Sequence, residues 1–115
     1  MTIHFYGIPN CDTVKKARKY LDGKGAEYTF HDYKKEGADP AKIAAWIDAH
    51  GVDVVLNRRG TTFRKLSEED RADIDGAKAV RLLEANPSMI KRPIVEHDGG
   101  ILVGFKEETW SAALS

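Results

Sequence analysis

Cysteine is scarce in this chain of 115 residues, in which Cys11 is the only one. A single cysteine excludes a disulfide within the chain, and with it the dithiol mechanism of proteins that carry a Cys-x-x-Cys motif. A redox cycle would therefore need a thiol from another molecule. The histidines stand far apart, with only one cysteine to join them, which argues against a zinc site and predicts no metal. They are His4, His31, His50 and His97.

A net charge and long apolar runs are missing as well. Lysine and arginine together number 18, as do aspartate and glutamate, so the formal net charge is zero. Such a balance gives no overall field that would attract nucleic acid or an anionic membrane, and any anion binding must be local. No apolar run approaches the roughly 20 residues that span a bilayer, and the N-terminus has no secretion-signal pattern. We therefore expect a soluble, cytoplasmic protein with no nucleic-acid or membrane partner.

The spacing of apolar residues predicts strands and helices at both ends of the chain. The first are a strand at 2–6, a turn at 7–10, a helix that begins at Asp12 and ends at Gly23 or Gly25, and a strand at 28–32. A helix between two strands predicts a βαβ unit whose strands are parallel. The last are strands at 94–96 and 101–104 across the turn 97–100, which predict a β-hairpin, and a helix that contains Trp110.

The segment between these parts is expected to be mostly helical. A helix is predicted to begin at Pro40, with Asp39 as its N-cap, and to close at Gly51. Further helices are predicted after Ser67 and at 75–85. The remaining stretches are polar loops at 34–38 and 57–62 and a valine-rich stretch at 52–56, which fits either a strand or a helical turn.

This order of elements matches an α/β fold with a four-stranded, mixed, thioredoxin-like sheet. We expect a single domain over residues 1–115, with a helical insertion at about 35–90 between the second and third strands. The topology places the N-terminus of the first helix beside the start of the third strand.

Cys11 stands where the first helix begins. The unpaired backbone N–H groups and the positive dipole end of a helix N-terminus both favour the thiolate, which is the reactive form of cysteine. The ammonium of Lys15, one turn further along, should also lower the pKa of the thiol, while the carboxylate of Asp12 opposes it. The alternative is a buried cysteine that packs as a small hydrophobic residue.

Three separated segments of the sequence resemble the ArsC family. They are residues 9–13 (Pro-Asn-Cys-Asp-Thr), 59–66 (Arg-Gly-Thr-Thr-Phe-Arg-Lys-Leu) and 91–94 (Lys-Arg-Pro-Ile). Within the family, the chain is similar to the YffB-like branch, which also includes relatives of the regulator Spx. The resemblance implies a thioredoxin fold with a helical insertion, a nucleophilic cysteine at Cys11, and arginines that hold an oxyanion or a carboxylate near it.

The resemblance also implies which cations bind the substrate. Arg92 matches the arginine that precedes the family's proline. Arg59 matches the arginine of the insertion loop best, but Arg58 is adjacent, and the choice between them stays open. With Lys15, these residues form the expected anion-binding set.

The function implied is that of a glutathione-linked thiol oxidoreductase. Pro93 is expected to be cis and to face the cysteine, which leaves backbone groups that pair with a peptide-like ligand such as glutathione. Asn10 and Thr13 belong to the same expected site. Glutathione would be a co-substrate, not a bound cofactor, and a second glutathione or another redox protein, such as glutaredoxin, would open the mixed disulfide with Cys11.

Two alternatives remain open. The first is an arsenate reductase linked to glutathione and glutaredoxin, although the family's arsenate reductases have a histidine where this chain has Gly7 and a further arginine near the positions of Gly104 and Phe105. The second is an Spx-like regulator without enzymatic activity, which binds RNA polymerase. Redox sensing of the Spx type uses a Cys-x-x-Cys pair, which this chain lacks.

Overall fold

The computed structural model describes residues 3–114, so Thr2, the first residue of the predicted strand at 2–6, lies outside the described residues. The chain divides into two compact units. The first consists of the residues up to Glu36 together with those from Arg92 onward, and the second of Gly37–Lys91. Within residues 3–114, no helix has both the length and the apolar character that a membrane crossing requires.

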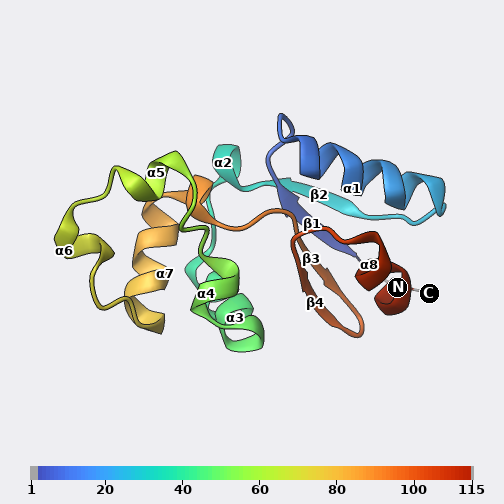
Figure 1. The fold of residues 1–115 in the computed structure, drawn as a ribbon. Coiled ribbons are helices and arrows are strands. Elements are labelled where there is room, and N and C mark those ends of the chain that lie inside the picture. Colours follow the sequence, from blue (N-terminus) through green and yellow to red (C-terminus); the bar gives the residue numbers. More distant parts are fainter. Residues whose placement is uncertain (1–2, 115) are drawn as a thin grey trace. The chain divides into compact units, whose positions relative to one another are not determined.

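The first unit contains a four-stranded sheet with the order β2-β1-β3-β4 (Figure 1). Its strands are β1 (His4–Gly7), β2 (Thr29–Asp32), β3 (Ile94–His97) and β4 (Gly100–Val103). Strand β1 pairs in parallel with β2 and antiparallel with β3, and β3 pairs antiparallel with β4. The predicted α/β fold with a mixed four-stranded sheet, a parallel βαβ unit and a hairpin is therefore confirmed.

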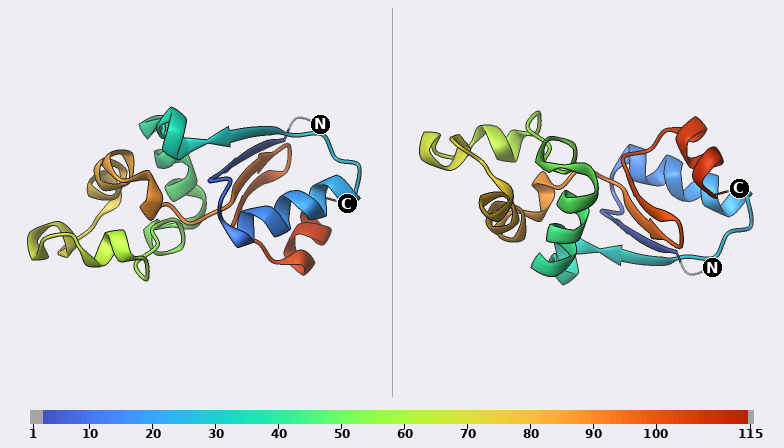
Figure 2. Two further views of the ribbon diagram at one scale, coloured as in Figure 1. Left: turned by 90° about the horizontal axis from the view of Figure 1, so that it is seen from above. Right: turned by 90° about the horizontal axis from the view of Figure 1, so that it is seen from below.

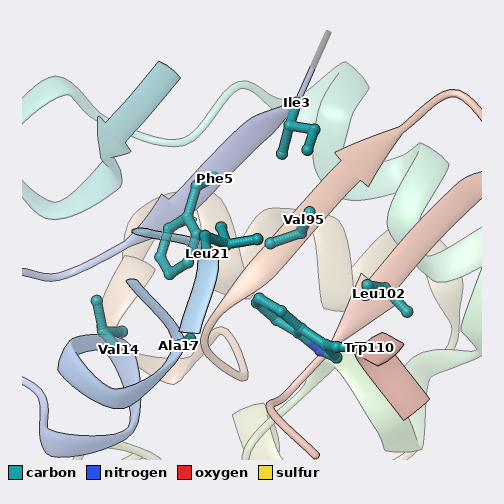
Figure 3. Packing of buried hydrophobic residues seen from close by; sticks show 8 residues of the cluster. All are labelled: Ile3, Phe5, Val14, Ala17, Leu21, Val95, Leu102 and Trp110. Carbon is teal, nitrogen blue, oxygen red and sulfur yellow. The ribbon is translucent and has the colours of Figure 1, made fainter. Parts of the chain in front are cut away.

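The helices α1 (Asp12–Gly23) and α8 (Glu107–Leu114) pack against one face of this sheet (Figure 2). Helix α1 buries every third or fourth residue, as an amphipathic helix on a core does. The side chains that meet between the helices and the sheet are drawn in Figure 3 and are Ile3, Phe5, Val14, Ala17, Leu21, Val95, Leu102 and Trp110. This core holds the N-terminus of α1 at a fixed place beside the sheet.

A short helix, α2 (Tyr33–Glu36), follows β2 directly. The prediction of a polar loop at 34–38 is therefore wrong for residues 34–36. The carboxylate of Asp32 caps this helix, because its Oδ1 accepts hydrogen bonds from the backbone N–H groups of Lys34 and Lys35 at 3.1 and 3.2 Å. Tyr33 is only 1% exposed, and the burial of its ring anchors the helix.

The second unit is helical. Its elements are α3 (Pro40–His50), α4 (Val52–Val55), α5 (Thr61–Arg64), α6 (Glu68–Arg71), α7 (Gly76–Ala85) and the 3-10 helix η1 (Pro87–Met89). Helix α3 packs against α7. The three predicted helices are confirmed, and in each of them a side-chain oxygen accepts a backbone N–H at the start, from Asp39, Ser67 and Asp75 respectively.

One stretch of the second unit differs from its predicted structure, and another decides between two predicted alternatives. The polar loop predicted at 57–62 ends at Gly60, since α5 begins at Thr61 and is anchored by the buried ring of Phe63. The stretch at 52–56 forms a helical turn, and its last residue, Leu56, then makes an antiparallel bridge with Ile90. Leu56 and Ile90 are both buried, and the bridge joins the residue after α4 to the residue after η1.

Candidate active site

Three segments of the chain meet at one edge of the sheet in the first unit. In the parallel pair, Gly7 at the end of β1 lies opposite Asp32 at the end of β2. In the antiparallel pair, Ile94 at the start of β3 lies opposite Tyr6. The chain therefore leaves β1, leaves β2 and enters β3 at the same edge of the sheet. The residues at these points include Cys11, Tyr33 and Arg92.

Cys11 is the N-cap residue of α1 and is only partly buried. Its thiol makes no capping hydrogen bond of regular geometry. Burial raises the pKa of Cys11, but the backbone N–H of Val14, a side-chain hydrogen bond from Arg92 and the backbone N–H of Thr13 all lower it, and together they outweigh the burial. The pKa of Cys11 is therefore below its ordinary value, and the thiolate is favoured.

Lys15 and Asp12 are both exposed, and neither is among the principal causes of the lowered pKa of Cys11. The helix N-terminal amides, whose effect was predicted, and Arg92 lower the pKa of Cys11. Asn10 and Thr13, which were predicted to belong to the same site, flank Cys11 and are also exposed. The sulfur of Cys11 thus lies at the margin of the core, with exposed residues on both sides.

The guanidinium of Arg92 makes side-chain hydrogen bonds to both Cys11 and Tyr33. Burial lowers the pKa of Arg92, but the hydrogen bond to Cys11 and the charges around it raise the pKa, so this arginine is a permanent cation beside the sulfur. Arg92 therefore lies beside Cys11, and its role in binding a substrate anion stays a prediction.

Tyr33 is a member of this cluster that the sequence analysis missed. Burial raises the pKa of Tyr33 well above its usual range, and the neighbouring Arg92 opposes this only in part, so the phenol is neutral at physiological pH. The signal that could have located Tyr33 is its position directly after the second strand of a parallel βαβ unit whose first strand leads to the cysteine.

The peptide bond between Arg92 and Pro93 is cis, as the family resemblance implied. The carbonyl oxygen of Pro93 accepts a hydrogen bond from the backbone N–H of Gly104 at 2.8 Å. Gly104 has a φ of 74°, in the left-handed region that favours glycine, and its own carbonyl oxygen accepts a 3.0 Å hydrogen bond from Nε1 of Trp110. Pro93 is thus tied to the buried Trp110 through one glycine.

Arg58 and Arg59 belong to the second unit, where they line a cleft of about 670 Å³ together with Asp53 and Lys91. The guanidinium of Arg58 pairs with the carboxylate of Asp53 at 2.9 Å. The guanidinium of Arg59 has no side-chain partner among residues 3–114, and its backbone N–H donates to Oδ1 of Asn57 at 3.1 Å. Of the two arginines, Arg59 is the one free to bind an anion, and its grouping with Cys11 stays a prediction.

Within residues 3–114, no cluster of three or more histidine, cysteine, aspartate or glutamate side chains is arranged to hold a metal ion. Around Cys11, the described site places backbone amides and a guanidinium that favour the thiolate.

Comparison with protein families matches residues 6–113, nearly the whole chain, to the ArsC family. The chain belongs to the ArsC family. A Haemophilus influenzae protein is 42% identical over 113 residues, which are 98% of this chain and 99% of that protein. The solved structure of the YFFB protein is 53% identical, has a TM-score of 0.95 and covers 98% of this chain and 99% of its own. The global transcriptional regulator Spx of Listeria innocua is 26% identical over 92% of this chain and 82% of its own length.

Gly7 and Phe105 both lie in packed surroundings in this ArsC-family chain. A Cβ atom on Gly7 would lie 3.0 Å from Cγ2 of Val14, so a side chain at this position would need Val14 to give by a few tenths of an ångström. Phe105, near the position of the further arginine of the family's arsenate reductases, stands edge-on to Trp110 with 4.9 Å between ring centroids. These two positions serve packing in this chain.

Proposed function

We propose that this ArsC-family protein is a glutathione-linked thiol oxidoreductase in which Cys11 is the nucleophile. The observation that carries the proposal is the hydrogen bond from the guanidinium of Arg92 to the sulfur of Cys11, at the N-terminus of α1. A cation and a helix N-terminus beside a partly exposed sulfur are the surroundings that make a cysteine reactive.

The reaction proceeds by two thiol–disulfide exchanges. The thiolate of Cys11 attacks the glutathione sulfur of a mixed disulfide, a new S–S bond forms, and the other sulfur leaves as a thiolate that takes a proton from water. A second glutathione, as its thiolate, then attacks the glutathione sulfur bound to Cys11. Oxidised glutathione leaves, and Cys11 is again a thiolate. The substrate sulfur is reduced and glutathione is oxidised, without a second cysteine in the chain.

Binding of glutathione uses its peptide character and its carboxylates. The backbone around the cis-Pro93 pairs with the extended tripeptide, with Asn10 and Thr13 beside it. Arg59, whose guanidinium is free, binds a carboxylate in preference to Arg58, which is engaged with Asp53. Lys15 is exposed and adds positive charge one turn beyond Cys11.

The test is turnover of a glutathione mixed disulfide, coupled to NADPH oxidation through glutathione reductase. The wild-type protein should show turnover, and intact mass spectrometry should find one glutathione on the wild type and none on Cys11→Ser. In a companion NMR titration, glutathione should shift the amide signals of residues 7–13 and 92–94. A protein that is readily alkylated at Cys11 but shows neither exchange nor shifts at millimolar glutathione would overturn the proposal.

Arsenate reduction is a second candidate, which membership of the ArsC family favours. In that reaction the thiolate of Cys11 would attack arsenic while the arginines neutralise the anion. The packed positions of Gly7 and Phe105 argue against it. Turnover of arsenate with glutathione and glutaredoxin decides between the two, because disulfide exchange without arsenate reduction supports the first proposal.

An Spx-like regulator that binds RNA polymerase is the third candidate, and the 26% identity to Spx favours it. A disulfide switch within Cys-x-x-Cys is excluded, because Cys11 is the only cysteine. Recovery of RNA polymerase subunits by the purified protein, equally with Cys11→Ser, would support this function over the enzymatic ones.

A further inference from the structure

Tyr33 is the least exposed member of the cluster around Cys11. Its side chain is 1% exposed, although it carries a phenolic hydroxyl that needs a hydrogen-bond partner when buried. It opens α2, immediately after the strand whose last residue, Asp32, is in register with Gly7. The fold therefore brings this hydroxyl to the edge of the sheet from which the chain runs on to Cys11.

One partner of the hydroxyl is the guanidinium of Arg92, which donates hydrogen bonds to both Tyr33 and Cys11. A guanidinium is a planar fork of five N–H donors, so an acceptor on one side sets the plane in which the other donors point. An arginine held at the sulfur alone could turn about its side-chain bonds. A second hydrogen bond, to a buried oxygen, restricts that rotation.

We propose that the phenolic oxygen of Tyr33 holds the guanidinium of Arg92 in the orientation in which it donates to the sulfur of Cys11. Tyr33 is then a positioning residue, which acts on the thiolate through Arg92. This deepens the proposed function, on which it rests only in taking Cys11 as the reacting group.

The chain contains a matched control for this arrangement. The phenolic oxygen of Tyr28 also accepts a hydrogen bond from an arginine, from Nε of Arg18 at 3.1 Å. Arg18 stacks on Phe30, 4.2 Å from the ring centroid, and is not among the principal causes of the pKa of Cys11. Tyr28→Phe and Tyr33→Phe therefore remove the same atom from the same kind of pair, but only the second pair includes the sulfur.

The first experiment titrates the thiolate of Cys11 by its ultraviolet absorbance in both variants. We expect Tyr33→Phe to raise the pKa of Cys11 by roughly half a unit to one unit, part of the one to three units that a nearby opposite charge supplies. The alkylation rate below this pKa should then fall about two- to threefold, since a thiolate of higher pKa is also the better nucleophile. Tyr28→Phe should change neither quantity, and an unchanged pKa in Tyr33→Phe would overturn the proposal.

The second experiment is a double-mutant cycle with Arg92→Ala, which separates positioning from a purely structural role. If Tyr33 acts through Arg92, adding Tyr33→Phe to Arg92→Ala should leave the pKa of Cys11 where Arg92→Ala alone puts it. The same rise in both backgrounds would show that Tyr33 acts without Arg92, against the proposal.

A measurement on the wild type covers the case in which Tyr33→Phe fails to fold. The side-chain NMR signals of Arg92 should show separate Nη protons with slow rotation, as for a guanidinium held on two sides. Averaged signals, like those of an exposed arginine, would contradict the proposal. None of these readouts involves glutathione. If Tyr33→Phe raises the pKa of Cys11 but the protein shows no disulfide exchange, only the proposed function is overturned. If the protein shows exchange but Tyr33→Phe leaves the pKa of Cys11 unchanged, only the role of Tyr33 is overturned.

Discussion

Gly7 and Val14 are packed so closely that a Cβ atom on the glycine would lie 3.0 Å from Cγ2 of the valine. Val14 is fully buried on the first turn of α1, and Gly7 is the last residue of β1. A side chain at Gly7 would therefore press on the first turn of α1, which has Cys11 at its start.

Replacing Gly7 by alanine should destabilise the protein through this contact. Overpacking in a closed position costs about 1–3 kcal/mol of unfolding free energy, because Val14 or the strand must move. Urea unfolding measures the effect. Gly23→Ala is the control, since nothing lies within 4 Å of its added Cβ atom, and it should leave the stability equal or higher. Equal stabilities of Gly7→Ala and the wild type would show that the contact yields at no cost.

The lowered pKa of Cys11 predicts a dependence of stability on pH. Because the folded pKa lies below that of the unfolded chain, the folded state releases the proton first, and this stabilisation grows as the pH rises between the two values. It is complete above about 8.5, the ordinary pKa of cysteine, and is lost as the pH falls through the folded pKa. Unfolding of the wild type and Cys11→Ser across this range should give a difference in stability that increases with pH. A constant difference would mean that the pKa of Cys11 is the same in both states.

Arg92→Lys and Arg92→Ala should both slow the alkylation of Cys11 by iodoacetamide near neutral pH. Alanine removes the charge and the hydrogen bond to the sulfur, whereas lysine keeps a point charge without the planar fork. We expect the order wild type, Arg92→Lys, Arg92→Ala, with the last about tenfold slower, for a rise of one to two units in the pKa of Cys11. Arg18→Lys, whose cation lies over Phe30, should react like the wild type. An equal rate for all four proteins would place the cause of the lowered pKa in the helix N-terminus alone.

Arg58 and Arg59 should differ in their effect on glutathione. Arg59→Ala removes the free guanidinium and should raise the KM for glutathione about tenfold, which corresponds to about 1.4 kcal/mol. Arg58→Ala breaks an exposed pair with Asp53 and should change the KM little. Steady-state kinetics with varied glutathione measures both. The reverse ranking would identify Arg58 as the arginine that binds the carboxylate.

Local chemistry made much of the fold predictable. Asp39 accepts a backbone N–H as the N-cap of α3, and Pro40 has a fixed φ that suits the first helical position. Both effects act on adjacent residues, so the start of this helix could be predicted from the sequence. Short elements were harder to predict. Helix α2 has four residues and depends on the burial of Tyr33, and α5 depends on that of Phe63, which are properties of the folded chain.

The sequence by itself determined that one thiol carries the chemistry, since Cys11 has no alternative and stands at a helix start that local patterns reveal. Only the tertiary structure decided that Tyr33 joins Arg92 beside that thiol. The contact of Tyr33 with Arg92 joins residues far apart in the chain, and it exists because the parallel register of β1 with β2 and the antiparallel pairing of β1 with β3 bring their ends to one edge. Strand register arises from cooperative long-range packing, so no local pattern around either residue encodes it.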